Sequence, residues 1–455
     1  MQNVQLVGRR TARNLTQTSS GCVNGPSCAF KGSTLTRGMH GEVRASAGDG
    51  LQELQSINPR VASVKPSKTM ALADLASSLK ADGVDVISLA AGEPDFDTPR
   101  PIIDAGIEAL EKGITRYTPN AGVPLLKKKI CEKLERENGV VYSPEEIVLS
   151  NGAKQSVWQG VLACCSPGDE VVIPAPFWVS YPEMARLAGA EPVIVETDSN
   201  QGFLMTASQL RSALTEKSRL LILCSPSNPS GAVYSEEQLR EIADVVREHP
   251  RLVVLSDEIY EYIVYGDTKH VSFASLPGMH ERTLTVNGFS KAYAMTGWRL
   301  GYVAAPKIFA KACAVIQSQS TSGASSIAQH AAIAALDMGA YGGDVVRDMV
   351  AEFEKRRDYV VSRLENMKGV KIVEPQGAFY ALPDVSSVFG KSIDGVVMQD
   401  SDDVVKMLIE KANVAPVPGE AFGSPSCIRI SYACSMGELE EACDRMESRF
   451  FDLIV

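Results

Sequence analysis

Residues 290–301 read SKAYAMTGWRLG and come just after an apolar, strand-like run, LTV at 284–286. In this segment Ser290 precedes Lys291, and Arg299 follows the lysine by eight residues. Taken singly, Lys291 would be a solvated surface lysine and Arg299 an ordinary ion-pair partner, because both residue types usually lie outside the core. Taken together, the three side chains predict a covalent anchor beside a phosphate clamp.

Other candidate site residues follow apolar runs elsewhere in the chain. Residues 147–155 (IVLSNGAKQ) are typical of a strand, a glycine turn and a helix start, where backbone N–H groups would point at a phosphate. Residues 251–260 (RLVVLSDEIY) indicate a buried strand ending in acids. Residues 225–231 (SPSNPSG) contain turn-forming pairs. Each signal is weak alone, since such junctions are common in α/β proteins.

These segments resemble, in the same order, those of class I aminotransferases that depend on pyridoxal 5′-phosphate (PLP). The resemblance covers roughly residues 50–455. It implies that Lys291 holds the cofactor as a Schiff base. The phosphate would be bound by the following groups: the backbone N–H groups of Ala153 and Lys154 and the side chains of Ser290 and Arg299.

The resemblance also assigns the groups around the cofactor ring. Asp257 would pair with the pyridine nitrogen and keep it protonated, so that the ring withdraws electrons from the substrate. On the residues alone, an N-cap of a following helix carries equal weight for Asp257. Tyr260 and Asn228 would donate to the phenolate oxygen of the cofactor. Ser230 stands where the family usually has threonine.

Further residues match the substrate and interface positions of the family. Trp178 corresponds to the aromatic that covers the ring and touches substrate, although a lone aromatic is more often core. Arg429, in the alternating segment IRISYA, fits the receptor of the substrate's α-carboxylate; otherwise it would mark the exposed face of a strand. Gly92 matches the glycine segment that closes over substrate. Tyr117 resembles a tyrosine that reaches the phosphate across a dimer interface, which implies a homodimer with shared active sites.

The fold implied by the resemblance is the α/β fold type I of PLP-dependent transferases. It has a large domain with a seven-stranded, mostly parallel sheet, and a smaller α/β domain built from both chain ends. We expect an N-terminal arm and part of the small domain at 46–104, the large PLP-binding domain at 105–345, and the C-terminal small domain at 346–455. The alternation of apolar runs and amphipathic segments across 105–345 agrees, because it is typical of βαβ units. A charged amphipathic stretch at 346–366 suits a helix that links the domains.

Substrate choice is indicated by Thr69, Lys154 and the segment 177–184 (FWVSYPEM). They resemble a bacterial and plastid subgroup of aspartate aminotransferases, whose plant members also act on prephenate through the positions of Thr69 and Lys154. Arg429 would bind the keto-acid carboxylate of prephenate and Lys154 the ring carboxylate. Lys154 could instead neutralise the cofactor phosphate or stay solvated. The resemblance predicts conversion of prephenate to arogenate with glutamate or aspartate as donor, alongside aspartate–oxoglutarate exchange.

Four alternatives stay open. A plain aspartate aminotransferase would not use prephenate. An aromatic or alanine aminotransferase would need no receptor for a second carboxylate. A PLP-dependent lyase would need no keto-acid acceptor. A non-catalytic binding protein is least favoured, because Lys291, Asp257 and Arg299 are all present.

The composition and charge of the chain argue against several other classes of protein. The chain of 455 residues has a net charge of −10, and its first 45 residues carry six basic side chains against one acid. The rest therefore carries −15, which argues against a nucleic-acid partner. We expect no membrane span, because no apolar run approaches the required length. The ten cysteines are scattered without a CxxC pair, so that neither a metal site nor a disulfide framework is expected.

The first 45 residues differ from the rest of the chain. They bear arginines, serines and threonines, and they lack an apolar core of the kind found in secretory signals. This composition resembles an organellar transit peptide, with a disordered tail as the alternative. Composition does not separate plastid from mitochondrion, but plant members of the family favour the plastid, that is, the chloroplast stroma.

Overall fold

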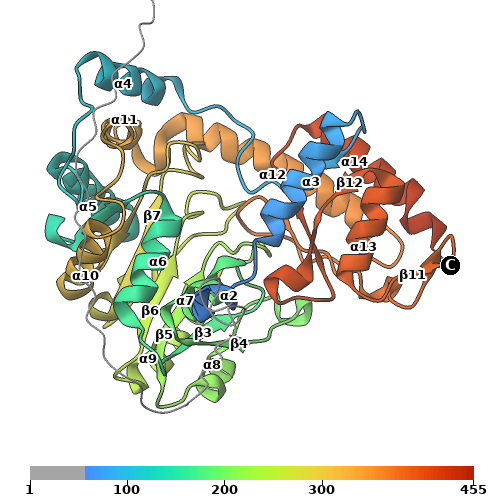
Figure 1. Ribbon diagram of the computed structural model, residues 1–455, viewed down its shortest axis with the longest axis horizontal. Coiled ribbons are helices and arrows are strands. Elements are labelled where there is room, and N and C mark those ends of the chain that lie inside the picture. The colour runs from blue at the N-terminus through green and yellow to red at the C-terminus, as the bar shows by residue number, and fades with distance from the viewer. Residues whose placement is uncertain (1–56, 455) are drawn as a thin grey trace, which may run out of the picture. The chain divides into compact units, whose positions relative to one another are not determined.

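The computed structural model describes residues 57–454, and these include one large sheet and three small ones (Figure 1). The predicted transit peptide at 1–45 and the first residues of the predicted N-terminal arm lie outside the described residues. The large sheet has the strand order β2-β8-β7-β6-β5-β3-β4. Its strands are β2 (Ile147–Ser150), β3 (Glu170–Pro174), β4 (Glu191–Val195), β5 (Ser218–Cys224), β6 (Val253–Asp257), β7 (Thr283–Gly288) and β8 (Gly301–Ala304).

Four of the six strand pairings in this sheet are parallel. The exceptions are the two pairings of β8, which runs antiparallel to both β7 and β2. A seven-stranded, mostly parallel sheet with helices around it confirms the predicted α/β fold class.

Helices cover both faces of the sheet. They are α5 (Pro124–Asn138), α6 (Ala153–Cys164), α7 (Ser180–Ala188), α8 (Ala207–Ala213), α9 (Glu236–Glu248) and α10 (Lys307–Ser318). Outside this layer, α11 (Ser326–Leu336) packs on α5, and α4 (Arg100–Glu111) packs on α11. The core on one face joins the strands to α6, α7 and α10. On the other face α8 and α9 pack under the middle strands, and α5 packs under β2 and β8.

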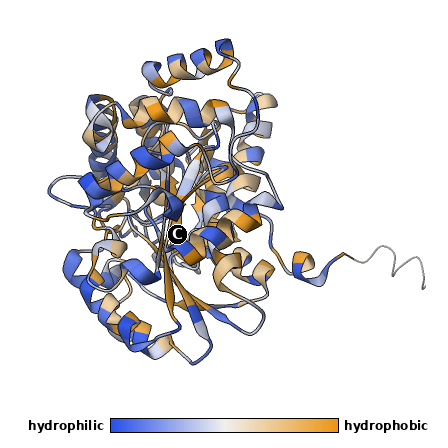
Figure 2. Cartoon of the chain, turned by 90° about the vertical axis from the view of Figure 1, so that its left-hand side faces the viewer, coloured by the Kyte–Doolittle hydropathy of each residue, from blue (hydrophilic) through white to orange (hydrophobic). Residues whose placement is uncertain are grey.

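The strand sequences explain this two-sided cover. In β5, Leu220 and Ile222 belong to the core with α6, whereas Leu221 and Leu223 belong to the core with α9. Side chains alternate between the faces of a strand, so a strand that is apolar at every position needs cover on both sides. Figure 2 shows the resulting orange strands among helices of mixed blue and orange.

A second group of elements combines segments from both ends of the described chain. Its strands are β1 (Ile87–Ser88), β9 (Tyr380–Ala381), β10 (Ser392–Ile393), β11 (Val396–Val397), β12 (Val414–Ala415), β13 (Val417–Pro418) and β14 (Ile428–Ser431). Its helices are α3 (Lys68–Ala81), α12 (Gly343–Asn366), α13 (Ser401–Met407) and α14 (Met436–Arg449). The short helix α2 (Pro59–Ala62) packs instead against α7 of the large sheet. Strand β1 pairs in parallel with β12, which brings residues more than three hundred positions apart side by side. The long helix α12 covers the stretch expected to link two domains, and the domain boundaries themselves remain predictions.

The topology gathers chemically useful residues at one edge of the large sheet. Strands β2, β5, β6 and β7 point the same way, so their carboxyl ends meet at that edge. In open α/β sheets, ligands bind outside such strand ends.

The described residues contain no helix with the length and apolar character of a membrane span. The eight cysteines of this part of the chain are all free thiols.

Candidate active site

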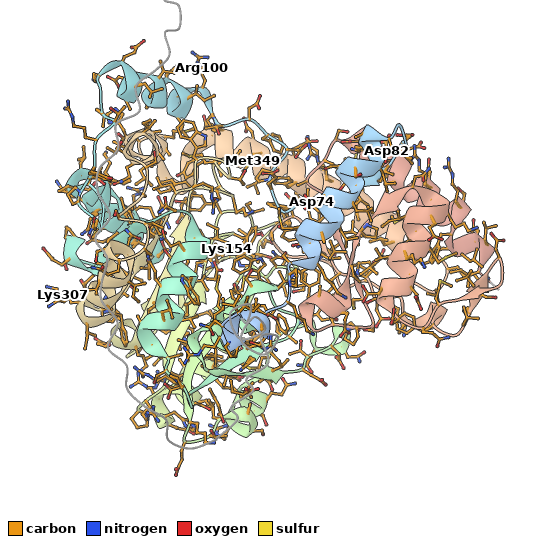
Figure 3. The ribbon with its side chains drawn as sticks, viewed as in Figure 1. Asp74, Asp82, Arg100, Lys154, Lys307 and Met349 are labelled. Atoms are coloured by element: carbon orange, nitrogen blue, oxygen red, sulfur yellow. The ribbon has the colours of Figure 1, made fainter. Side chains whose placement is uncertain are left out.

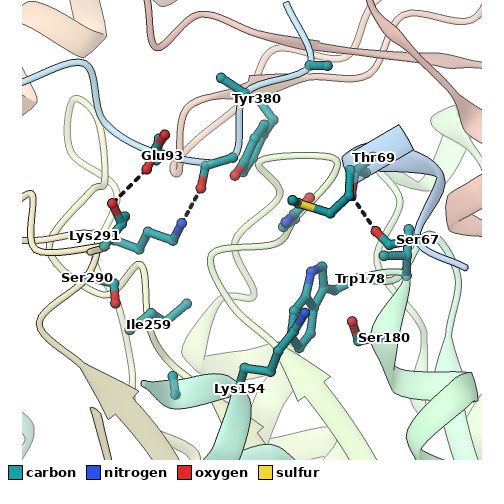
Figure 4. Close-up of a pocket in the computed structure, with 18 of the residues that line it drawn as sticks. Ser67, Thr69, Glu93, Lys154, Trp178, Ser180, Ile259, Ser290, Lys291 and Tyr380 are labelled. Carbon is teal, nitrogen blue, oxygen red and sulfur yellow. Dashed lines mark hydrogen bonds between the residues drawn. The ribbon is translucent and has the colours of Figure 1, made fainter. Parts of the chain in front are cut away.

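A cavity of about 560 Å³ lies at this edge of the sheet (Figure 4). It is lined by all but one of the predicted site residues: Thr69, Gly92, Ala153, Lys154, Trp178, Asn228, Asp257, Tyr260, Ser290, Lys291, Arg299 and Arg429. The exception is Tyr117, whose side chain is 97% exposed and does not line the cavity. The cavity of a single chain therefore holds every predicted residue that was not assigned to a dimer interface.

Lys291 reaches into the cavity from the turn after β7, and its ammonium group donates to the backbone oxygen of Gly92 (Figure 4). Burial lowers the pKa of Lys291 to about 8. The carboxylate of Glu93 opposes this shift, whereas the positive charges of Arg429 and Arg299 add to it. A lysine of this kind has an appreciable neutral fraction near neutral pH, as a nucleophile or base requires.

Asp257 ends β6 and is 4% exposed. Its Oδ2 accepts a hydrogen bond of 2.7 Å from the Tyr181 hydroxyl, and its Oδ1 accepts one of 3.3 Å from the Ile259 N–H. Burial raises the pKa of Asp257 to about 6, although both hydrogen bonds favour the ionised form. A turn, not a helix, follows at 259–262, so the N-cap alternative for Asp257 is wrong. Its carboxylate borders the cavity instead.

Two glycines shape a cradle for an anion at the start of α6. A Cβ atom on Gly152, which has φ +83°, would collide with the guanidinium of Arg299, and one on Gly301 would collide with the backbone nitrogen of Ala153. The side chain of Arg299 donates only to backbone oxygens, those of Thr296 at 2.8 Å and Asn151 at 3.3 Å. Both acceptors are neutral, so these hydrogen bonds leave the charge of Arg299 available to an anion. The backbone N–H groups at the start of α6 and the guanidinium of Arg299 together fit a phosphate group.

Arg429, on β14, is only 2% exposed. It donates to Oδ1 of Asn228 at 3.1 Å and to the backbone oxygen of Ala90 at 2.8 Å, and its Nε has no partner in the described chain. The guanidinium lies 4.5 Å from the ring centre of Tyr380. The exposed-face alternative for this arginine is therefore wrong. A buried cation whose protein partners are neutral is well placed to receive a carboxylate.

A second cation borders another part of the cavity. The Nζ of Lys154, in the first turn of α6, lies 5.0 Å from the ring centre of Trp178. Burial, reinforced by Arg299, lowers the pKa of Lys154. Helix α3 lines the same cavity with Thr69, whose hydroxyl hydrogen-bonds to that of Ser67 at 2.8 Å (Figure 4). Figure 3 shows Lys154 on the ribbon of α6. Among the described residues, the charge that acts on Lys154 is that of Arg299 and not that of a carboxylate, which leaves the ammonium available to an anionic ligand.

Several residues that line the cavity were not predicted from the sequence. Tyr380 hydrogen-bonds through its hydroxyl to that of Tyr260 at 3.0 Å. Glu93 accepts a 2.6 Å hydrogen bond from the Thr296 hydroxyl. Tyr181 lies three residues after Trp178 at a helix start. This spacing places both side chains on one side of the turn, so it could have indicated that Tyr181 also lines the cavity. Tyr380 comes from a distant two-residue strand and has no comparable signal.

Behind Asp257 and Tyr260 lies a buried polar network. It contains the one group of potential metal ligands that the described residues bring together, Glu258, Glu261 and His270. The carboxylate oxygens of this group are already hydrogen-bonded: to Ser256, Ser272, the Phe273 N–H and His270 on Glu258, and to Lys133, Asn138 and Asn287 on Glu261. The network fixes the turn that carries Asp257 and Tyr260 from its far side.

The donor set as a whole suits a flat, phosphorylated ring that carries a carbonyl group. An amine with a lowered pKa, a buried carboxylate for a ring nitrogen and a phosphate cradle lie in one cavity. Arg429 and Lys154 add two places for carboxylates from elements far apart in the sequence.

Comparison with known proteins agrees with this chemistry. Residues 84–446 match the family described as aminotransferase class I and II. The chain is 60% identical over 393 residues to the bifunctional aspartate aminotransferase and glutamate/aspartate-prephenate aminotransferase of Petunia hybrida, covering 86% of this chain and 82% of the relative. It is 57% identical over 423 residues to an aspartate aminotransferase of Pinus pinaster, covering 92% and 86%.

Solved structures show the same similarity. The aspartate aminotransferase of Rhizobium meliloti superposes with a TM-score of 0.85 at 42% identity, covering 88% of this chain and all of that one. The Thermus thermophilus aspartate aminotransferase with maleate gives a TM-score of 0.82 at 41% identity, covering 86% and 99%. The chain belongs to the class I and II aminotransferases, a family of PLP-dependent enzymes.

Proposed function

We propose that this chain transfers an amino group from glutamate or aspartate to prephenate, giving arogenate, and also exchanges aspartate and oxoglutarate for oxaloacetate and glutamate. The observation that carries the proposal is Lys154. Its ammonium borders the cavity beside Trp178 and has no carboxylate partner in the described chain, although Arg429 already offers one carboxylate receptor. Two receptors match substrates with two carboxylates.

The common feature of these substrates supports a double activity. Aspartate, glutamate, their keto acids and prephenate all carry a second carboxylate. Arg429 binds the carboxylate next to the reacting carbon, and the free Nε of this arginine adds a donor there. Lys154 binds the second carboxylate, with the Thr69 hydroxyl as a further donor. An ammonium group on a flexible stem can meet carboxylates at different distances, which suits both a short amino acid and a cyclic diacid.

The residues divide the catalytic work as follows. Bound PLP supplies an electron sink for the carbanion left when the substrate's α-proton is removed. Lys291, as a free amine, moves that proton at the α-carbon, which its lowered pKa permits. Asp257 holds a proton on the ring nitrogen, while Ser290, Arg299 and the N–H groups that begin α6 hold the phosphate. Tyr260 and Asn228 donate to the ring oxygen, Trp178 covers the ring, and the Gly92 segment closes over the substrate.

A comparison of acceptors tests the proposal. The purified chain is supplied with glutamate or aspartate and with prephenate, oxoglutarate, oxaloacetate or phenylpyruvate, and product amino acids are measured. High kcat/KM for prephenate with little turnover of phenylpyruvate is expected, because prephenate carries a second carboxylate and phenylpyruvate does not. If prephenate is inert while aspartate and oxoglutarate react, the chain is a plain aspartate aminotransferase.

We further propose a homodimer with shared active sites. Tyr117 lies between α4 and α5, and its almost complete exposure supports a place at an interface, because an aromatic side chain gains from being covered. In such a dimer its hydroxyl would reach the phosphate held by the partner subunit.

We also propose delivery to the plastid by residues 1–45, on the strength of their basic, hydroxyl-rich composition. Fusion of these residues to a fluorescent protein in leaf cells should give chloroplast fluorescence. Mitochondrial fluorescence would reverse the assignment, and diffuse cytosolic fluorescence would remove it.

A further inference from the structure

A buried phenol contacts the carboxylate that faces the cofactor ring. Tyr181, in the first turn of α7, is 2% exposed, and its hydroxyl donates to Oδ2 of Asp257 at 2.7 Å. The other oxygen, Oδ1, accepts from the Ile259 N–H at 3.3 Å. Each oxygen of Asp257 is thus held by one donor. The two donors come from different elements, so together they fix the plane of the carboxylate.

The proton of this hydrogen bond belongs to Tyr181. Burial, reinforced by the charge of Asp257, raises the pKa of Tyr181 well above its usual range, so the phenol stays neutral. Cys224 lies opposite Asp257 in the register of β5 and β6. Burial raises the pKa of the Cys224 thiol to about 12. Asp257 is the charged member of this trio. The Tyr181 hydroxyl therefore acts as a donor to Asp257.

This donor acts on the charge of Asp257. Burial raises the pKa of Asp257, and Glu258 raises it further, whereas the bonds from Tyr181 and Ile259 and the charge of Lys291 lower it. A carboxylate that pairs with a protonated ring nitrogen must bind the shared proton less tightly than the nitrogen does. A hydrogen bond that favours the carboxylate form consequently favours a protonated ring.

We propose that Tyr181 is a positioning residue for transamination: its hydroxyl fixes the orientation of Asp257 and keeps this carboxylate ionised, so that the shared proton stays on the cofactor ring nitrogen. The inference rests on the use of PLP and deepens the assignment of Asp257. Tyr181 also packs edge-on against Trp178, with ring centres 5.3 Å apart and planes at 81°. The short stretch from Trp178 to Tyr181 thereby positions the indole that covers the cofactor ring and the phenol that keeps Asp257 charged.

Replacing Tyr181→Phe tests the proposal, because it removes the hydroxyl and keeps the ring. In the substrate-free holoenzyme, loaded with PLP that carries ¹⁵N in its ring, the nitrogen resonance should move toward that of an unprotonated nitrogen. The dissociation constant for PLP should rise with it, because the ion pair with Asp257 is weakened. We expect kcat to fall by about tenfold or more, the effect of losing a hydrogen bond to a charged group, while KM for the amino donor changes less than about threefold.

A matched control is Tyr142→Phe. Tyr142 is also a buried phenol, bonded to the Thr285 hydroxyl at 3.4 Å, but it does not line the cavity. This variant should leave the ¹⁵N resonance and the PLP affinity unchanged. An unchanged resonance in Tyr181→Phe would overturn the proposal even if activity fell, since the phenol would then serve packing alone. Both cofactor measurements need no amino acid, so they hold or fail independently of the substrate assignment.

Discussion

Four cationic side chains border the cavity, and they are not equivalent. Lys291 and Arg299 lie on one segment of sequence, whereas Lys154 and Arg429 come from α6 and β14. Inside the described chain, the hydrogen bonds of Arg299 and Arg429 go to neutral oxygens, which leaves their charges for ligands. Excess positive charge raises the local concentration of dianionic substrates and lowers the pKa of the reactive amine.

The charge of Lys154 can be tested by Lys154→Met, which keeps much of the side-chain length. We expect kcat/KM for aspartate and prephenate to fall by about 10–100-fold, because about 1–3 kcal/mol of a charged hydrogen bond is lost. Turnover of a neutral amino acid should change little. Lys311→Met, on the exposed side of α10, is the control for loss of one positive charge. Equal losses on neutral and acidic substrates would assign Lys154 to the phosphate instead.

The lowered pKa of Lys291 predicts a pH dependence for covalent capture of PLP by the cofactor-free protein. Only the neutral amine attacks, so the capture rate should rise with pH and level off above a midpoint of about 8. Stopped-flow absorbance of the lysine-bound cofactor measures this rate, and Lys291→Ala provides the blank. A rate that still rises beyond about pH 10 would mean that the lysine has the ordinary pKa of a solvated amine.

At the scale of elements, close approach of a strand to a helix start builds the proposed phosphate cradle. Strand β8 begins at Gly301, against the first residue of α6, and Gly152 gives room to the Arg299 guanidinium. The same elements form the core with β7, so packing and binding depend on one contact. The buried network around Glu258 and Glu261 similarly fixes the turn after β6.

Adding one methyl group at this contact should therefore weaken both packing and PLP binding. Gly301→Ala would place its Cβ against the backbone nitrogen of Ala153, so the start of α6 must shift, at a cost of about 1–3 kcal/mol. The dissociation constant for PLP should rise by tenfold or more, on the order of one lost hydrogen bond to an anion. Gly297→Ala, on the same segment, has open space around the added atom and should bind PLP normally. Equal affinity in both variants would exclude Gly301 from the cradle.

At the scale of the whole molecule, segments from both chain ends complete a site that the large sheet only begins. Gly92 and Thr69 come from the N-terminal side and Arg429 from the C-terminal side of the described chain. Asp95, just after the Gly92 segment, forms a 2.7 Å ion pair with Arg356 of α12. Contacts of this kind would tie the proposed closure of the Gly92 segment over substrate to the position of the C-terminal elements.

The proposed dimer makes a prediction about mixtures of inactive variants. Lys291→Ala and Tyr117→Ala, refolded together, should recover up to about a quarter of wild-type activity, because half of the dimers are mixed and each mixed dimer has one intact site. The control mixture is Lys291→Ala with Arg429→Ala. These two residues share the cavity of one chain, so neither site of a mixed dimer would be intact. If the test mixture stays as inactive as the control, Tyr117 acts in its own chain's site.

The sequence by itself determined the fold class and most of the site, because the relevant residues cluster around strand ends. Apolar runs such as 251–257 indicate buried strands, and in a mostly parallel sheet their carboxyl ends meet at one edge. Local order along the chain therefore brought Asp257, Asn228, Lys291 and Ala153 together. Resemblance to a family then supplied roles that the residue types alone left open.

Only the tertiary structure decided the second layer of contacts and the state of charge. The hydrogen bonds of Tyr181 to Asp257 and of Tyr380 to Tyr260 join residues 76 and 120 positions apart, and no local pattern encodes such pairs. Burial, which sets the pKa of Lys291 and of Asp257, likewise depends on every element that excludes water from the cavity. The sequence specifies the chemical type of each side chain. The burial and neighbouring charges that set its pKa exist only in the packed structure.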